Sequence, residues 1–362
     1  MSVITLLPSG STLSPEKLGN ELEIENMVIC PRCKSDVSSN ESQISCPNCG
    51  NSYPIIDGVP RLVADGISKT TRLTFDRKWK LYDNGHHPLW GNAIDGSFLE
   101  ISYEYPVSEE RYMSWRDFAC KFLRVEPRYF ESRTILDAGC GTGWLSYTMA
   151  RLGARVIATD LADSSVDLTS RILSGLGNTK VIQADLTELP FRKESFDSIV
   201  SLGVMHHTPN TKQTFLRLSK LLKPNGEFFI HVYERVQPRK ENLTEMVRKI
   251  IHLFPKDVQL EICKHLLTVD FRLLKEHPAK RKFYRLLNLI IMLSKTPEES
   301  FDAYSPKYNH RHTYDEVASW YEEAGFSEVE SLTGPSRHAK GKRNYGGALW
   351  MKGRMGPLMT RR

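Results

Sequence analysis

Five short apolar runs alternate with stretches of helical spacing through the middle of this chain of 362 residues. The runs are typical of buried strands and cover residues 134–138, 154–159, 180–183, 196–202 and 227–233. Strands that alternate with helices in this way favour parallel pairing with crossover helices. The pattern therefore predicts an α/β fold with a doubly wound sheet, and it places any ligand at the carboxyl ends of the strands.

A closing part of the sheet is predicted further along the chain. Thr313 and Glu316 form a capping-box pattern at the start of a helix that ends before Gly325. Residues 327–332 and 348–351 then have strand character. We expect them to close the sheet as an antiparallel pair.

Residues 234–312 separate the fifth strand from that helix. Three stretches of this insertion have helical spacing, residues 241–253, 258–267 and 283–293, and basic positions alternate there with Leu, Ile and Phe. We interpret the insertion as a helical cap over the site. Apolar stripes of this kind usually pack into a core. The alternative is an apolar pocket or a membrane-facing surface for a lipid-linked acceptor.

Four of the seven cysteines form two C-x2-C pairs near the start of the chain. The pairs are Cys30 with Cys33 and Cys46 with Cys49, and twelve residues lie between them. Two such turns bring four thiolates to the corners of a tetrahedron, which predicts a closed, structural Zn2+ site. The alternatives are redox-active pairs or disulfides, and two paired turns in a reducing compartment argue against both.

The first apolar run breaks into three glycines, Gly139, Gly141 and Gly143, before a helix pattern begins at Trp144. A phosphate-binding loop would need G-x-x-x-x-G-K-[ST], which is absent here. A dinucleotide turn would be G-x-G-x-x-G, and Trp144 occupies the position of its third glycine. A pyrophosphate would therefore lose its approach to the helix N-terminus. The remaining candidate is S-adenosylmethionine, which carries no phosphate.

Acidic residues follow the second and third predicted strands. Asp160 ends the second strand about twenty residues after the glycines, where an acid accepts hydrogen bonds from both ribose hydroxyls. Asp185 follows the third strand, where an acid is able to accept a hydrogen bond from an adenine amino group. An Asp at a strand end is often only a helix cap, but five strand–helix steps in order favour a cofactor site.

Five segments of residues 134–233 carry a resemblance to a known family: LDAGCGTG, ATD, ADLTELPF, FDSIVSLGVMHHTPN and LLKPNGEFF. This part of the chain resembles the class I S-adenosylmethionine-dependent methyltransferases, and within them the type 11 group that includes the ubiquinone/menaquinone methyltransferases. The resemblance implies a Rossmann-like class I methyltransferase sheet. It also implies these cofactor-binding residues: Asp137, Gly139, Cys140, Gly141, Gly143, Asp160, Leu161, Asp185, Leu186, Leu202 and Gly203.

One departure concerns the substrate. Residues 201–204 differ from the N-P-P-[YF] motif that is found where exocyclic base amines of DNA are methylated. This difference argues against an adenine-amine DNA substrate.

The segment CPRC…CPNCGNSYPIIDGVPRLV, within residues 28–64, carries a second resemblance. Through both cysteine pairs and the P-I-x-D-G-x-P pattern, it resembles the small zinc-ribbon activator subunit of tRNA methyltransferases and its bacterial relatives. The resemblance implies a ribbon that stabilises the chain or docks, and that does not carry the chemistry.

Methyl transfer from a sulfonium chiefly needs an acceptor held in line at near-attack distance. An oxygen acceptor must also lose a proton, for which a histidine near neutral pKa is a suitable base. We predict His207, His310 and His312 as candidate catalytic residues, with His231 in the fifth strand as a further candidate. The segment SPKYNHRHT, which holds two of them, resembles a recurring segment of bacterial methyltransferases of the same group. The alternative is that these histidines only orient the loop.

The formal net charge of +6 is unevenly placed. Residues 234–311 hold 16 Lys and Arg against 10 Asp and Glu, and residues 335–362 hold 8 basic residues and no acid. These segments indicate an acidic substrate, nucleic acid or a membrane surface as partner, with a solvated charged face as the alternative. No apolar run is long enough to span a bilayer, and the first ten residues lack a secretory pattern, so we expect a cytoplasmic protein with peripheral membrane contact at most.

The sequence thus predicts six parts of the chain. They are a flexible leader (1–27), the zinc ribbon (28–64), a helical N-terminal extension of the core (65–133), the cofactor-binding core (134–233 and 313–352), the helical cap (234–312) and a basic tail (353–362). In the extension, Tyr105, Tyr112 and Trp115 are expected either to line the mouth of the site or to serve packing alone.

The expected function is methyl transfer from S-adenosylmethionine to a small-molecule acceptor, such as a lipid-linked or sugar-linked compound or a quinone-like ring. One alternative is an rRNA or tRNA methyltransferase whose ribbon aids RNA binding, because a four-cysteine ribbon before this core also resembles the bacterial 23S rRNA guanine methyltransferases. The acidic balance outside the two basic segments argues against it, since no basic stripe crosses the chain. A second alternative is a non-catalytic scaffold that binds the cofactor.

Overall fold

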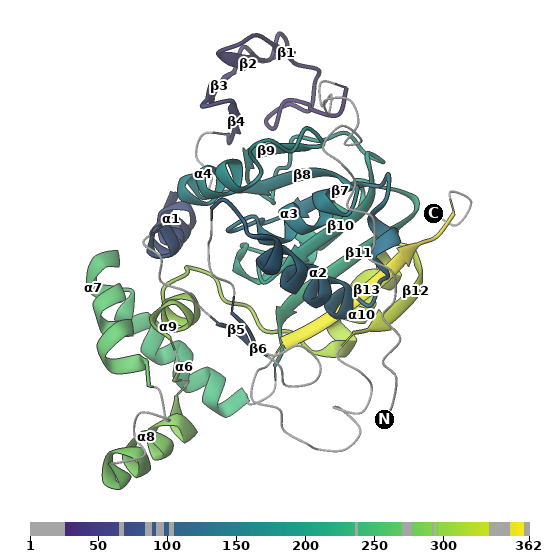
Figure 1. Cartoon of the computed structure of the whole chain (residues 1–362). Helices are drawn as coiled ribbons and strands as arrows, with labels where there is room; N and C mark the ends of the chain where they lie inside the picture. Colours follow the sequence, from purple (N-terminus) through teal and green to yellow (C-terminus); the bar gives the residue numbers. More distant parts are fainter. Residues whose placement is uncertain are drawn as a thin grey trace, which may run out of the picture.

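The structure is a computed structural model that describes residues 26–64, 69–83, 89–91, 98–100, 105–235, 238–269, 277–291, 293–294, 296–332 and 348–357. Its centre is an 11-stranded sheet with helices on both faces (Figure 1). A separate two-stranded hairpin consists of β5 (Leu89–Gly91) and β6 (Phe98–Glu100). Most of the predicted leader lies outside the described residues.

The main sheet confirms the predicted doubly wound α/β class. Its strands are β1 (Ser38–Ser39), β2 (Gln43–Ser45), β3 (Ser52–Ile56), β4 (Val59–Leu62), β7 (Thr134–Ala138), β8 (Arg155–Asp160), β9 (Thr179–Ala184), β10 (Phe196–Leu202), β11 (Leu222–Tyr233), β12 (Phe326–Ser331) and β13 (Ala348–Met355). Their order is β1-β2-β3-β4-β9-β8-β7-β10-β11-β13-β12. From β4 to β11 in this order all pairs are parallel, and β13 and β12 close the sheet antiparallel. The order reverses at β7, which places a ligand crevice at its carboxyl end.

Two strands are longer than the sequence predicts. β11 begins at Leu222, because residues 222–226 pair with β10 through a register shift and so extend the strand toward its start. β13 runs to Met355 and therefore includes the first residues of the segment that we predicted as a basic tail. Gly353 lies there under a ring of α10, where a Cβ would be 2.4 Å from the Tyr321 side chain.

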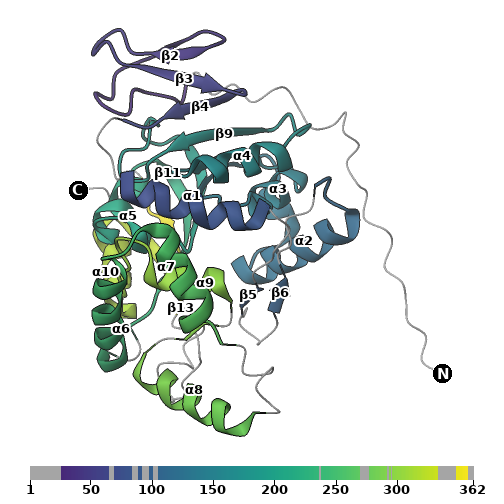
Figure 2. The same ribbon diagram turned by 90° about the vertical axis from the view of Figure 1, so that its left-hand side faces the viewer.

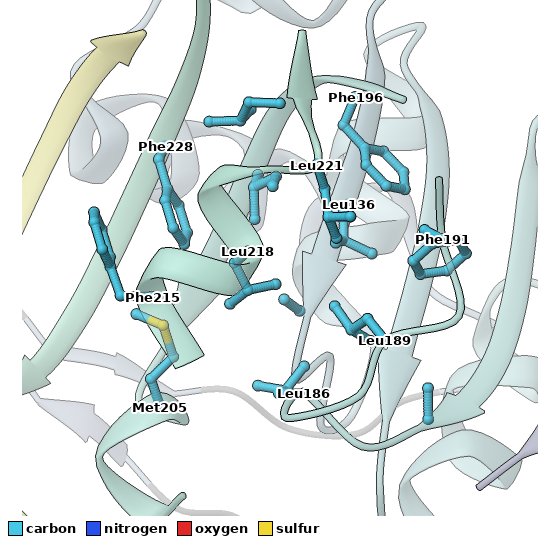
Figure 3. Packing of buried hydrophobic residues seen from close by; sticks show 14 of the residues in the cluster. Leu136, Leu186, Leu189, Phe191, Phe196, Met205, Phe215, Leu218, Leu221 and Phe228 are labelled. Atoms are coloured by element: carbon cyan, nitrogen blue, oxygen red, sulfur yellow. The ribbon is translucent and has the colours of Figure 1, made fainter. Parts of the chain in front are cut away.

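Helices cover both faces of the sheet. They are α1 (Lys69–Asp83), α2 (Glu109–Leu123), α3 (Trp144–Arg151), α4 (Asp163–Ile172), α5 (Thr211–Ser219), α6 (Pro238–Ile251), α7 (Lys256–Ile262), α8 (Pro278–Ile290), α9 (Pro297–Tyr304) and α10 (Tyr314–Glu323). Neighbouring strand residues point to opposite faces, so Ile135 and Phe229 pack with α2 and α3 whereas Leu136 and Phe228 pack with α5 and α10. Figure 3 shows the second of these faces.

The N-terminal ribbon continues the sheet instead of forming a separate layer. β4 pairs in parallel with β9, so that Arg61 lies beside Gln183 and Leu62 beside Ala184. Arg61 also reaches α4, where its Nη2 lies 2.7 Å from Asp167 Oδ1. This pairing covers the edge that β9 would otherwise present to solvent. The sequence predicted the ribbon but not the strand on which it docks.

The insertion after β11 is helical, as predicted, with boundaries that differ by a few residues. α7 continues into a π-helical turn, Cys263–Leu267. α9 was not predicted; it begins at the cap residue Thr296, whose side chain accepts a hydrogen bond from Glu299 N, with Pro297 in the first turn. α9 contacts α1 and α6, whereas α8 lies at the end of the molecule opposite the ribbon (Figures 1 and 2). None of the described helices combines the length and apolar character needed to cross a membrane.

Candidate active site and metal centre

A cavity lies at the carboxyl ends of β7, β8, β9 and β10. Ten of the eleven residues predicted to bind a cofactor line it: Asp137, Gly139, Cys140, Gly141, Asp160, Leu161, Asp185, Leu186, Leu202 and Gly203. The exception is Gly143, which precedes α3 and packs against Thr169 and Ile172. The fold thus brings residues from four strand ends to one place.

The glycine turn leaves bare backbone on one side of this cavity. Gly139 and Gly141 have φ of +95° and +57°, which side chains rarely adopt. A Cβ on Gly139 would lie 2.4 Å from Val204 Cγ2, and one on Gly141 would lie 2.8 Å from the ring of Trp79. Neither position has room for a side chain, so a ligand meets the main chain here.

Two buried carboxylates support the turn. Asp160 accepts hydrogen bonds from Gly141 N at 3.1 Å and from Ala162 N at 3.0 Å. Asp137 accepts one from Ser146 Oγ at 2.6 Å. Burial raises the pKa of both carboxyls, that of Asp137 to about 7. Because each carboxylate oxygen has two acceptor positions, both groups remain able to accept hydrogen bonds from a ligand.

Asp185 lies on the neighbouring strand end. Its Oδ1 accepts hydrogen bonds from Thr187 N at 2.7 Å and from Thr187 Oγ1 at 2.6 Å. These bonds fix the loop so that Asp185 and Leu186 both line the cavity. An adenine ring would therefore meet an acceptor and an apolar side chain at this end.

Aromatic side chains form a further wall of the cavity. They are Phe75 and Trp79 of α1, Phe118 and Phe122 of α2, Trp144 of α3 and Trp350 of β13. Phe122 meets Trp350 edge to face, with ring centroids 3.8 Å apart. Of the aromatics that we singled out in the extension, Tyr112 and Trp115 pack against Tyr147 of α3 and have the packing role. The cavity is reached instead by residues one to two turns later on α2.

A charged corner lies beside this wall. Lys78 of α1 and His207 line the cavity, and Asp302 of α9 lies behind them. Lys78 Nζ is 2.6 Å from Asp302 Oδ1, and the Tyr233 hydroxyl donates to Asp302 Oδ2 at 2.5 Å. His207 Nε2 is 3.7 Å from the same Oδ2, while His207 Nδ1 lies 2.9 Å from the Tyr308 carbonyl oxygen. A carbonyl only accepts, so His207 Nδ1 carries a hydrogen and donates it to Tyr308.

The charge at Asp302 is stabilised by its neighbours. Burial alone would raise the pKa of this carboxyl, but Lys78 and His207 outweigh burial and hold the pKa well below its usual range. The side chains of Lys78 and Asp302 are only 9% and 14% exposed. This corner therefore holds a desolvated ion pair beside the ring of His207.

The other candidate histidines, His231, His310 and His312, are not among the residues that line the cavity. His310 N donates to the His206 carbonyl oxygen at 2.9 Å. Burial lowers the pKa of His312 to about 4 and that of His231 to about 3, and it also lowers the pKa of His206 well below its usual range. Of the three predicted catalytic histidines, His207 is the one that lines the cavity among the residues that the structure describes.

Lys78 and Asp302 were missed by the sequence reasoning. They are 224 residues apart, and each lies in a helical stretch that reads as a charged surface. The available signal was the helix TFDRKWKLYD, in which Lys78 falls between the buried rings of Phe75 and Trp79. No local pattern indicates its partner.

The four paired cysteines form the predicted metal centre. Their Sγ atoms all lie within 4.8 Å of one another, with Cys33 and Cys46 3.4 Å apart and Cys30 and Cys49 3.6 Å apart. A tetrahedral zinc with bonds of about 2.3 Å requires sulfur separations near ~3.8 Å. The donor set and its spacing therefore fit one tetrahedral ion and leave no open coordination position, as in structural zinc sites.

Comparison with known proteins agrees with this geometry. Residues 136–230 match a family model described as a methyltransferase domain. This domain is of the S-adenosylmethionine-dependent class, which confirms the predicted family and cofactor. Residues 22–58 match a second model, described as Trm112p-like protein, which confirms the resemblance of the ribbon.

Two curated relatives are similar to part of this chain. A ubiquinone biosynthesis O-methyltransferase of Rhizobium etli (strain CIAT 652) is 28% identical over 159 residues, which are 40% of this chain and 63% of that protein. A demethylmenaquinone methyltransferase of Clavibacter sepedonicus is 26% identical over 196 residues, 54% of this chain and 66% of that protein. The chain thus spans less than two thirds of the length of these relatives.

Solved structures include the complex between the Haloferax volcanii Trm112 methyltransferase activator and a methyltransferase. The match is 16% identical with a TM-score of 0.42, and it covers 79% of this chain and 97% of that chain.

Proposed function

We propose that this chain transfers the methyl group of S-adenosylmethionine to an oxygen atom of a small acceptor that carries an aromatic or apolar part. The observation that supports this best is the continuity of the cavity. One part of its lining is the glycine turn with Asp160 and Asp185, and another part holds Lys78 and His207. A cofactor on the first part would have its acceptor on the second.

The residues of this chain supply orientation and proton removal. S-adenosylmethionine, when bound, supplies an electrophilic methyl group. The acceptor hydroxyl would give its proton to His207 Nε2, since Nδ1–H is held by the Tyr308 carbonyl. Asp302, 3.7 Å from Nε2, would stabilise the resulting imidazolium, and Lys78 would favour the negative charge that develops on the acceptor oxygen.

The aromatic wall supports an apolar acceptor. Phe118, Phe122 and Trp350 offer ring faces and edges but no charge, which suits a ring or a prenyl chain. The names of the relatives refer to ubiquinone and menaquinone. An acceptor of quinone-like or prenylated phenol chemistry is therefore our first choice.

A labelled methyl-transfer assay tests this function. The full chain is incubated with methyl-labelled S-adenosylmethionine and either a prenylated catechol or the same compound with both hydroxyls already methylated. We expect label in the catechol alone, and a rate about 100-fold lower for His207→Gln than for the exposed control His265→Gln. Label in neither compound at saturating concentration, or equal rates for the two variants, would contradict the proposal.

A tRNA or rRNA substrate is the second candidate, because the ribbon matches the Trm112p-like family. Its charge does not favour RNA: residues 26–64 hold three basic and three acidic residues. RNA binding through phosphates weakens steeply with salt. A salt titration with total RNA therefore separates the candidates, and methylation of RNA at rates above those of the catechol would favour this second one.

A further inference from the structure

Exposed apolar side chains gather on the helices after β11. Ten of the fourteen large hydrophobic side chains that are exposed in the described part of the chain lie there: Leu243, Met246, Ile250, Leu253, Phe254, Val258, Leu266, Phe283, Leu286 and Ile290. Single exposed apolar residues are ordinary, but clustering on one part of a surface marks a contact site. This clustering exceeds what packing within the helical cap accounts for.

α6 carries two apolar faces. One is buried in the cap: Ile251 belongs to its core, and Arg248 donates to the carbonyl oxygens of Ala303 and Pro306, each at 2.6 Å. The other face has a spacing of three, four and three residues, which forms a stripe along one side of a helix. It consists of Leu243, Met246 and Ile250 of the helix and of Leu253 in the turn that follows, which are 42%, 62%, 60% and 81% exposed.

α8 repeats the pattern and adds charge. Its exposed stripe is Phe283, Leu286 and Ile290, with a spacing of three and four residues. At 100° per residue, Lys280 and Lys282 fall on the two sides of this stripe. The helix holds four basic residues and no acid, and within the described residues neither lysine forms an ion pair.

The position of α8 leaves this surface accessible. It lies at the end of the molecule farthest from the ribbon in both views (Figures 1 and 2). It is held to α6 by a hydrogen bond from Lys240 Nζ to Asn288 Oδ1 at 3.1 Å. Asn288, which makes this contact, lies on a different side of α8 from the stripe, so the stripe points away from α6.

We propose that α8, extended by the exposed stripe of α6, docks on the surface of an anionic lipid bilayer. An apolar stripe flanked by lysines fits the boundary between acyl chains and headgroups, where the lysine stems lie along apolar surface and the ammonium groups meet phosphates. Basic residues near an anionic surface add electrostatic attraction to the apolar contact. The occupant is a membrane surface and not a spanned bilayer, in keeping with the length of the helix.

Two other occupants fit the surface less well. A second copy of the chain would bring two helices of four basic residues and no acid against each other, which is repulsive. Nucleic acid would satisfy the lysines but leave the stripe of Phe283, Leu286 and Ile290 in water. A lipid surface satisfies both the charge and the apolar area.

Docking of these helices would connect to the active site through α9. α6 contacts α9, and Asp302 of α9 pairs with Lys78 on the cavity wall. The membrane proposal rests on the surface of α6 and α8 and holds whichever acceptor is methylated.

Vesicle sedimentation with the full chain tests the proposal. Vesicles contain phosphatidylcholine alone or phosphatidylcholine mixed with phosphatidylglycerol. We expect binding to the mixed vesicles at low salt, weaker binding at high salt, and little binding to phosphatidylcholine alone. The variant Phe283→Ser/Leu286→Ser/Ile290→Ser should bind at least about tenfold more weakly, and Lys280→Glu/Lys282→Glu should lose its preference for the mixed vesicles.

Matched variants control for folding and for surface change in general. Ile56→Ser/Met113→Ser alters exposed apolar residues outside the cap, and Lys193→Glu/Lys220→Glu alters exposed lysines outside it; both should bind as the wild type does. The triple serine variant should unfold at the wild-type temperature, because its positions are exposed. Three results would overturn the proposal: no sedimentation of the wild type with mixed vesicles, unchanged binding by the triple variant, or a concentration-dependent dimer that the triple variant abolishes while vesicle binding persists.

Discussion

Lys78 of α1 and Asp302 of α9 form an ion pair at 2.6 Å that joins the N-terminal extension to the cap beside the cavity. The carboxylate also accepts the Tyr233 hydroxyl and faces His207 Nε2. Because both charges are largely removed from water, each depends on the other. The pair therefore serves the stability of the fold and the electrostatics of the site together.

Comparison of Asp302→Asn with the double variant Lys78→Met/Asp302→Leu separates these two roles. Breaking a buried pair on one side costs about 3–5 kcal/mol of unfolding free energy, because the other charge is left alone. We expect Asp302→Asn to lower both stability and methyl transfer, while Lys78→Met/Asp302→Leu regains stability but not activity. Denaturant unfolding measures the stability of each variant, and the labelled assay measures its methyl transfer. Asp257→Asn is the control. It changes an exposed acidic residue of α7 and should alter neither stability nor methyl transfer. Full activity of the double variant would show that the pair is structural alone.

The three predicted catalytic histidines should differ in their effects. His207→Gln removes the acceptor nitrogen on the cavity wall, and we expect methyl transfer to fall about 100-fold with little change in affinity for S-adenosylhomocysteine. His310→Gln and His312→Gln act behind the wall, so transfer should fall less, through the loop that they orient. Turnover and calorimetry of the three variants provide the comparison. If His207→Gln keeps wild-type turnover, a histidine base is the wrong mechanism and proximity suffices.

Removal of the metal should destabilise the ribbon and expose the sheet. Because the four thiolates close the ribbon and β4 pairs with β9, loss of the ion would free the β9 edge. We expect one zinc per chain in the wild type by elemental analysis. Cys46→Ser should lose the zinc, lower the thermal midpoint and aggregate. Cys120→Ser, outside the cluster, should retain the metal and the midpoint. Zinc retained in full by Cys46→Ser would contradict the assignment of the site.

Stability should depend on pH through the buried histidines. Burial lowers the pKa of His231 from the usual 6.5 to about 3 and that of His312 to about 4. The unfolded chain therefore binds protons first as pH falls from about 6.5 toward 4, and each histidine reduces the free energy of unfolding by about 1.4 kcal/mol per pH unit in this window. Asp137, whose folded pKa is raised to about 7, acts in the opposite direction.

Single variants isolate the histidine contribution from that of Asp137. Denaturant unfolding of the wild type and of His231→Gln, measured from pH 7 to pH 4, should differ in slope by about 1.4 kcal/mol per pH unit at the acid end. His277→Gln, at an exposed position, should leave the slope unchanged. Parallel curves for the wild type and His231→Gln would mean that His231 is protonated in the folded chain.

The part of the cavity that we propose for the cofactor could be assembled from sequence because it is built locally. Each strand end is followed within a few residues by its ligand-facing group, as with Gly139 after β7 and Asp160 at the end of β8. The fold then needs only the parallel order of the strands to bring these groups together. Each cysteine pair is likewise formed by residues close together in the sequence, so the metal centre was predictable for the same reason.

The part that we propose for the acceptor was not predictable, because it is assembled from distant segments. Lys78 and Asp302 meet across 224 residues, and Phe122 meets Trp350 from the other end of the chain. A charge in a helix looks like a solvated position until its partner is known. The pairing of β4 with β9 is a main-chain contact, and side-chain patterns say little about which edge a strand joins.

The central claim is that the cavity at β7 binds an adenosyl sulfonium compound through the bare glycine turn and Asp160. Isothermal titration of the full chain with S-adenosylhomocysteine and with NADH tests it most directly, with Asp160→Asn and the exposed control Asp167→Asn in parallel. The account predicts one S-adenosylhomocysteine per chain, affinity at least about tenfold weaker in Asp160→Asn, unchanged affinity in Asp167→Asn, and no heat with NADH. Heat with NADH and none with S-adenosylhomocysteine would contradict it.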